Sequence, residues 1–144
     1  MYKLLTWLPA VMVLGAVMYK PVKEATETKT VNKNLSFAVY KDNAYTSAAY
    51  NNTSAEVHIT VEKVSTSGKH TIVWDKKLDS KSLSQYPSVK NALKQNVTIP
   101  NVNQKKEYLA VHYTLTYNSK GSELQMWENT IVKENNSEKV EIKI

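Results

Sequence analysis

The amino-acid sequence predicts an all-β fold: a sandwich of seven antiparallel strands with one short helix, preceded by an N-terminal hydrophobic segment. Two observations lead to this prediction. From Leu35 to Ile144, apolar side chains recur at every second position, which is the period of a strand with one buried face. Polar runs that contain Gly or paired Asn separate these stretches, as hairpin loops do; they are residues 51–54, 65–69, 118–122 and 135–137.

Seven stretches carry the alternating pattern, each with one face for a core and one for water. They are residues 35–40, 57–62, 71–75, 97–99, 109–117, 124–132 and 140–144. The stretch 124–132 differs, because Met126, Trp127 and Ile131 make it apolar on both faces. From Asp79 to Gln95, apolar side chains after Pro87 are spaced by three and four, which predicts one short helix over an open end or edge of the sandwich.

The N-terminus has the pattern of an export signal. A single Lys precedes about 15 mostly apolar residues, Leu4 to Met18, a run that is short for a membrane-spanning helix of about 20. Residues 1–18 are interpreted as a signal peptide cleaved after Ala16; an uncleaved anchor and a buried helix of the domain are the alternatives. Residues 19–34 are rich in Lys, Thr and Glu, which predicts a flexible linker before the sandwich at 35–144. The protein is expected to be secreted or otherwise extracytoplasmic, and to contact a membrane only through residues 4–18.

Composition excludes several classes of function. The net charge is +6, and all 19 basic residues are Lys. Without the planar guanidinium fork of Arg, specific reading of nucleic-acid bases is not expected. The chain has no Cys, which excludes a thiolate nucleophile, a disulfide framework and a lipid-modified cysteine. A small exported domain without disulfides indicates a bacterial cell envelope.

Two stretches resemble immunoglobulin-like and fibronectin type III-like sandwiches. Trp74 follows the second predicted strand much as the core Trp of that superfamily does, and Val97-x-Ile99-x-x-Val102 before Tyr108 is similar to the segment leading into its tyrosine corner. The resemblance implies a sandwich of this kind and a bond from the Tyr108 hydroxyl back to the preceding turn. The strong apolar residues after Tyr108 fall on the other phase, so either Tyr108 faces outward and no corner forms, or both faces of its strand are covered. The architecture alone implies no particular function.

The sequence shows no catalytic or metal-binding constellation. The chain has three Gly, no G-x-S-x-G elbow and no phosphate-binding loop, and its acidic residues are scattered. His58 and His112 fall on the polar face of their predicted strands, and on neighbouring strands they could hold a metal or shuttle a proton. The superfamily layout places these strands in opposite sheets, so separate surface positions are expected. We therefore expect no enzyme activity, no cofactor and no metal.

The segment 42–54 is the candidate binding loop, because exposed Tyr beside Asn and Ser suits contacts with peptides or sugars. Its candidate residues are Tyr45, Tyr50, Asn51 and Asn52; the alternative is that Tyr is simply favoured in strands.

The function favoured by these features is a non-enzymatic, exported binding or adhesion module of the cell envelope, with a protein or a glycan as its ligand. A first alternative is a structural subunit of a surface fibre or biofilm matrix. In that homo-oligomer, the tail Lys139–Ile144 or the linker would add a strand to a neighbour. A second alternative is a secreted-enzyme inhibitor or immunity-type protein that blocks an enzyme with a loop.

Overall fold

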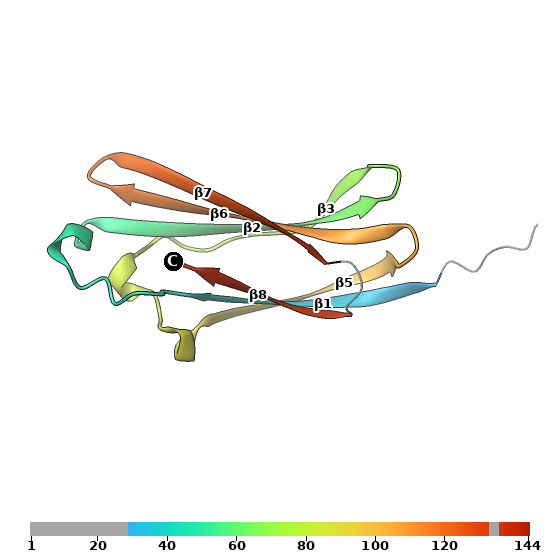
Figure 1. Cartoon of the computed structure of the whole chain (residues 1–144), viewed down its shortest axis with the longest axis horizontal. Helices are drawn as coiled ribbons and strands as arrows, with labels where there is room; N and C mark the ends of the chain where they lie inside the picture. Colours follow the sequence, from blue (N-terminus) through green and yellow to red (C-terminus); the bar gives the residue numbers. More distant parts are fainter. Residues whose placement is uncertain (1–28, 133–135) are drawn as a thin grey trace, which may run out of the picture.

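Two β-sheets pack face to face in the computed structural model, which describes residues 29–132 and 136–144 (Figure 1). The smaller sheet has the strand order β5 (Leu93–Asn103), β1 (Thr30–Tyr40), β8 (Ser137–Lys143). The larger sheet has the order β3 (His70–Lys77), β2 (Thr53–Ser65), β6 (Glu107–Ser119), β7 (Ser122–Val132), and the two-residue β4 (Lys81–Ser82) also pairs with β2. The predicted all-β sandwich is confirmed, with strands numbered to β8 in this part of the chain rather than seven.

β1 begins earlier than the sequence predicts. Residues 30–34, assigned above to the linker 19–34, pair with β5, and Lys33 within them is buried. The predicted linker boundary is therefore wrong, because the ladder that orders these polar residues depends on a strand far along the chain. The predicted segment 1–18 and residues 19–28 of the linker lie outside the described residues. Among the residues described, no helix has the length and apolar character needed to cross a bilayer.

The helix predicted within Asp79–Gln95 is not formed. The stretch instead holds β4 and two 3₁₀ turns, η2 (Leu83–Gln85) and η3 (Val89–Asn91). Pro87 disfavours helical backbone at the residue before it, and Tyr86 is extended, with φ −65° and ψ 139°. Val89, which the predicted helix would have turned toward the sandwich, is 60% exposed, whereas Leu83 and Tyr86 before Pro87 enter the core.

β8 runs parallel to its neighbour β1, whereas the other described strand pairs are antiparallel. β7 finishes at the end of the sandwich where β1 begins. β8 enters the smaller sheet from that end and therefore runs beside β1 in the same direction (Figure 1). The prediction of a wholly antiparallel sandwich is wrong at this pair. The tail Lys139–Ile144, which the fibre alternative would use to add a strand to a neighbour, is already paired within its own chain.

The core lies between the two sheets and is built from their facing side chains. Alternate residues of β1, β2 and β6 supply much of it, including Leu35, Phe37, Val39, Val57, Ile59, Val61, Leu109, Val111, Tyr113 and Leu115. The ring of Phe37 on β1 stacks on Trp74 of β3, with the ring centroids 5.3 Å apart and an interplanar angle of 0°. This pair therefore joins the smaller sheet to an edge strand of the larger one.

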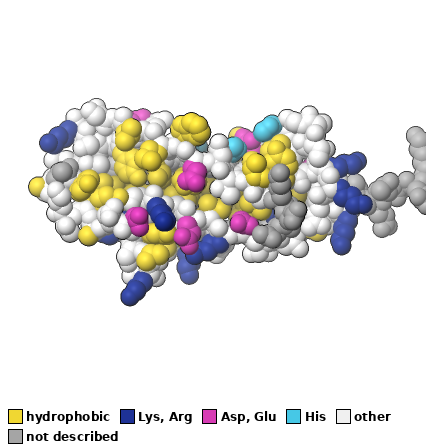
Figure 2. All heavy atoms as spheres, in the orientation of Figure 1, with side chains coloured by type: hydrophobic (Ala, Val, Ile, Leu, Met, Phe, Trp, Pro, Cys, Tyr) yellow, Lys and Arg dark blue, Asp and Glu magenta, His cyan; other side chains and the backbone are white. Residues whose placement is uncertain are grey.

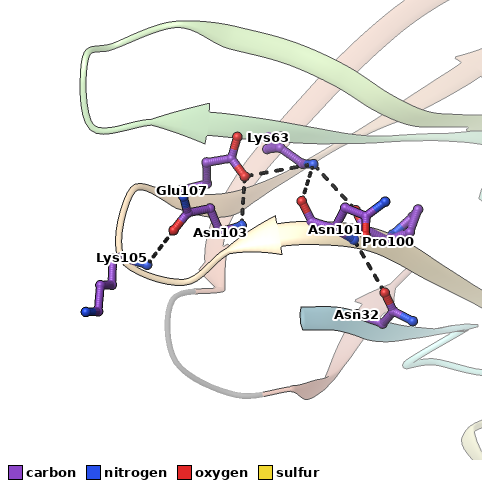
Figure 3. Close-up of polar contacts among 7 residues, drawn as sticks. All are labelled: Asn32, Lys63, Pro100, Asn101, Asn103, Lys105 and Glu107. Carbon is purple, nitrogen blue, oxygen red and sulfur yellow. Dashed lines mark hydrogen bonds and ion pairs between the residues drawn. The ribbon is translucent and has the colours of Figure 1, made fainter. Parts of the chain in front are cut away.

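A polar cluster joins the sheets at the end of the sandwich where β5 and β6 are connected (Figure 3). The Lys63 ammonium of β2 donates to the Asn101 carbonyl at 3.1 Å and lies 3.9 Å from a carboxylate oxygen of Glu107. That carboxylate accepts the Asn103 N–H at 2.8 Å, and the N–H of Asn101 donates to the Asn32 side chain at 3.4 Å. Because these contacts bind β2 to β5 and β1, we interpret the cluster as structural.

Tyr86, rather than Tyr108, is the buried tyrosine that bonds to a distant backbone carbonyl. Its hydroxyl donates to the Ala55 carbonyl at 2.9 Å, and burial raises the pKa of Tyr86 to about 12. Tyr108 is half-buried, and its hydroxyl has no hydrogen bond to any described residue. The corner implied for Tyr108 is therefore not observed in this part of the chain.

We predict that Tyr86→Phe lowers the free energy of unfolding by about 1–2 kcal/mol, because it removes the donor of a buried hydrogen bond. Urea unfolding of the full chain measures this loss. Tyr108→Phe is the matched control and is expected to change the free energy by less than about 0.5 kcal/mol. Equal losses in the two variants would contradict the assignment.

Candidate functional site

An apolar groove is lined by residues of the loop after β1 and of the hairpin of β6 and β7. This loop and this hairpin lie at the same end of the sandwich, away from the polar cluster (Figure 1). The groove has a volume of about 430 Å³. It is lined by Tyr45, Tyr50, Thr53, Leu83, Tyr117, Ser119, Ser122, Glu123, Leu124 and Met126. Aromatic and aliphatic side chains dominate this lining, and Glu123 is its single charged member. Such a concave, mainly apolar surface with a few polar groups is the usual form of a ligand site.

Two of the predicted site residues, Tyr45 and Tyr50, lie together in this groove. Their rings meet edge to face, with centroids 5.1 Å apart and planes at 78°. Tyr45 has a positive φ of 49°, and its hydroxyl donates to the backbone carbonyl of Ile144 at 2.5 Å. The end of the chain therefore holds Tyr45 in place, and Tyr50 leans against it with much of its ring exposed.

The other two predicted site residues do not line the groove. Asn51 and Asn52 form the exposed turn between the 3₁₀ turn η1 (Ala48–Tyr50) and β2. The Asn51 N–H donates to the Ala48 carbonyl at 3.3 Å, which closes that turn. The structure thus separates the predicted loop into two tyrosines that face the groove and two asparagines beside it.

The opposite wall of the groove comes from the hairpin of β6 and β7, which the sequence did not select as a site. Leu124 and Met126 of β7 lie opposite Tyr117 and Leu115 of β6. Both β7 side chains are exposed because β7 is an edge strand of its sheet. Burial raises the pKa of Tyr117, so its hydroxyl stays neutral at physiological pH. A signal for this wall was present in the two-faced apolar pattern of residues 124–132.

The histidines gather on the outer face of the larger sheet, contrary to the sequence prediction. β2 and β6 are neighbours in one sheet, with Thr60 opposite His112 and His58 opposite Thr114. Figure 2 shows histidine side chains close to acidic and apolar ones on the molecular surface. The expectation that His58 and His112 lie on opposite faces is wrong, because it rested on a strand order that this chain does not have.

Two carboxylates, those of Asp75 and Glu62, lie beside the three histidines. Asp75 lies 2.8 Å from the Nε2 atom of His58, and Glu62 lies 2.8 Å from Nδ1 of His70 and 3.5 Å from Nε2 of His112. The hydrogen bond from His70 lowers the pKa of Glu62, and the hydrogen bond from His58 lowers that of Asp75. In the described residues, no group of three or more such side chains has a geometry that could hold a metal ion.

The contacts between Glu62 and the histidines predict that the stability of the fold depends on pH in acid. The pKa of Glu62 is lower in the folded chain than its ordinary value of 4.5. Its carboxylate therefore stabilises the fold above that pH, and this contribution is lost as the pH falls through the lowered value. We expect Glu62→Gln to make the free energy of unfolding less dependent on pH below about 4.5. Urea unfolding across pH measures this, with Glu123→Gln as the control; an unchanged pH profile for Glu62→Gln would contradict the assignment.

Comparison of the chain with protein-family models, with curated proteins and with solved structures gave no match.

Proposed function

We propose that this chain is a non-enzymatic, exported binding module of the cell envelope, and that the groove between Tyr50 and Leu124 receives an apolar side chain of a protein partner. The observation that supports this is the convergence of two distant segments, the loop after β1 and the start of β7, on one apolar hollow. We further propose that the sandwich is a variant of the immunoglobulin-like kind, because Trp74 stacks on the core residue Phe37, while the pairing of β2 with β6 in one sheet departs from the strand order of that superfamily.

The chemistry of the lining favours a protein partner over a glycan. A sugar presents many hydroxyls, and each hydroxyl that is buried without a partner costs free energy. The polar groups of the lining are the hydroxyls of its tyrosines, of Thr53 and of its two serines, together with the carboxylate of Glu123. The Tyr45 hydroxyl already donates to the Ile144 carbonyl and the Thr53 hydroxyl to Ser119, so few of these groups remain for a sugar. An aliphatic or aromatic side chain buries its area there without leaving polar groups unpaired, which is how anchor residues of protein ligands bind.

The groove is also ordered before any partner binds. Tyr45 is fixed by its bond to the Ile144 carbonyl, and Tyr50 packs against Tyr45. The hairpin wall is held by continuous pairing of β6 with β7, from Leu109 opposite Val132 to Ser119 opposite Ser122. Since little ordering is needed on binding, more of the contact energy is expected to be retained as affinity.

The test is a selection of displayed twelve-residue random peptides against the full chain. The chain is attached through its N-terminus, because Ile144 is buried, and is held in lipid nanodiscs so that no detergent competes for the groove. We predict that the enriched peptides share an apolar residue. They are expected to bind at least about tenfold more weakly to Leu124→Lys than to the unchanged chain, since burying one Leu side chain contributes about 1.5–3 kcal/mol. Tyr50→Ala is expected to weaken the same peptides.

Ile72→Lys is the matched control, because Ile72 on β3 is 60% exposed and Leu124 is 62% exposed. The control is expected to bind the selected peptides as the unchanged chain does. Equal loss in Leu124→Lys and Ile72→Lys would contradict the proposal. So would a selection that enriches no peptide while soluble oligosaccharides bind, since that result assigns the groove to a glycan.

A further inference from the structure

Among the described residues, nothing pairs with the outer edge of β7 along its whole length. The strand pairs with β6 on one side, and no strand pairs with its other side among residues 29–132 and 136–144. Its exposed apolar side chains are Leu124, Met126, Trp127 and Ile131, and Trp127 is 76% exposed. A long edge strand of this kind presents a row of backbone N–H and C=O groups that can pair with another strand.

The other three edge strands carry features that discourage such pairing. β3 ends with Lys76 and Lys77, β5 contains Pro100 and is irregular in its pairing with β1, and β8 carries Lys139 and Lys143. Lysines, prolines and bulges are the usual means by which sheet edges avoid association.

β7 has none of these features. It contains no Lys and no Pro, and its register with β6 is unbroken. Of its two carboxylates, Glu128 accepts a hydrogen bond from the Tyr113 hydroxyl within its own sheet. This leaves Glu123 as the only carboxylate on the strand that is not engaged by a core tyrosine.

We propose that β7 pairs antiparallel with β7 of a second copy of this chain, about a two-fold axis at Trp127. Trp127 is the midpoint of Ser122–Val132, so a register centred there is the one that pairs the full strand with itself. A shared two-fold makes the contact self-complementary and closed. The two copies would then form one continuous sheet across the interface.

The side-chain pairs in this register are compatible. Antiparallel pairing about Trp127 sets Glu128 opposite Met126 and Glu123 opposite Ile131, so no two carboxylates face each other; like charges directly opposite would be destabilising. The two Trp127 rings meet on the outer face, where aromatic cross-strand pairs are favourable.

The pairing also bears on the groove. Leu124, on the groove wall, would stand opposite Thr130 of the second copy, so the open side of each groove would be bordered by the other chain. A dimer would therefore present two grooves, each completed at its β7 wall by the second copy.

Disulfide crosslinking tests the register, because the chain has no Cys of its own. Residues directly opposite in an antiparallel pair have Cα atoms about 4.5–5.5 Å apart, within the range of a disulfide. We expect Trp127→Cys to form a covalent dimer when the full chain in mild detergent is oxidised gently. A mixture of Glu123→Cys and Ile131→Cys, which keeps Trp127, is expected to crosslink. Either variant alone would not, because its two cysteines would lie roughly 26 Å apart along the strands.

Ile72→Cys on β3 is the control for random collision and is expected to form no disulfide between chains. The proposal is overturned if Ile72→Cys crosslinks as readily as Trp127→Cys, or if neither the Trp127→Cys chain nor the mixture crosslinks. Light scattering on the unchanged chain is expected to give the mass of two chains. A mass that continues to grow with concentration would overturn the closed pair in favour of a fibre. No ligand takes part, so these results are independent of the outcome of the peptide selection.

Discussion

Phe37→Ala is expected to lower the free energy of unfolding by about 3–5 kcal/mol, a large share of the 5–15 kcal/mol typical of a single domain. Phe37 is completely buried on β1, and its ring stacks on Trp74 of β3. Its removal leaves a cavity between the sheets and exposes the face of Trp74 that it covers. Urea unfolding, followed by circular dichroism in the β-sheet region, measures the loss.

Ile72→Ala is the control for this measurement, because it removes a large apolar side chain from an exposed position on β3, outside the proposed β7 contact. Surface changes of this kind alter stability by about 0.5 kcal/mol or less. A loss from Phe37→Ala no larger than that from Ile72→Ala would mean that the two sheets do not pack through Phe37.

Deletion of Lys139–Ile144 is expected to abolish cooperative unfolding. The tail contributes three buried side chains, Val140, Ile142 and Ile144, and its backbone pairs with β1. Ile144 also donates its N–H to the Tyr40 carbonyl at 2.9 Å. Burying each such side chain contributes about 1.5–3 kcal/mol, so the loss of three is comparable to the whole stability of a domain.

A thermal melt followed by circular dichroism measures this effect, with the double change Lys139→Ala and Lys143→Ala as the control. These two lysines are exposed, so the control is expected to melt cooperatively close to the unchanged chain. If the truncated chain melted at the same temperature as the control, β8 would not be part of the folded core.

The strands could be located from the sequence where a local signal exists. Period-two alternation places residues 57–62 and 109–117 in strands, because a side chain on a half-buried strand must match its face. Nothing local reveals that residues 30–34 belong to β1 or that β8 lies parallel to β1. Both depend on pairing between distant segments, and polar residues can occupy a strand once its partner is in place.

Only one of the two walls of the candidate site could be predicted from the sequence, for the same reason. Composition around Tyr45 and Tyr50 indicated a binding loop, whereas its facing wall at Leu124 and Met126 belongs to a strand that reads as apolar on both faces. That pattern has two explanations, a strand buried on both sides or an exposed edge, and the sequence does not distinguish them. Strand order decides between them, and it also decides that the histidines share one face.

The most direct test of the proposed contact region is a methyl NMR titration of the full chain with a selected peptide. Methyl labels on Met and Leu report from both sides of the molecule, including Met126 and Leu124 on the groove wall. We predict that the largest shift changes occur at Leu124, Met126 and Leu83, which line the groove, and that Leu35, buried elsewhere in the core, changes little. Shift changes that leave Leu124 and Met126 unaffected while the peptide binds would place the contact region elsewhere and contradict the account.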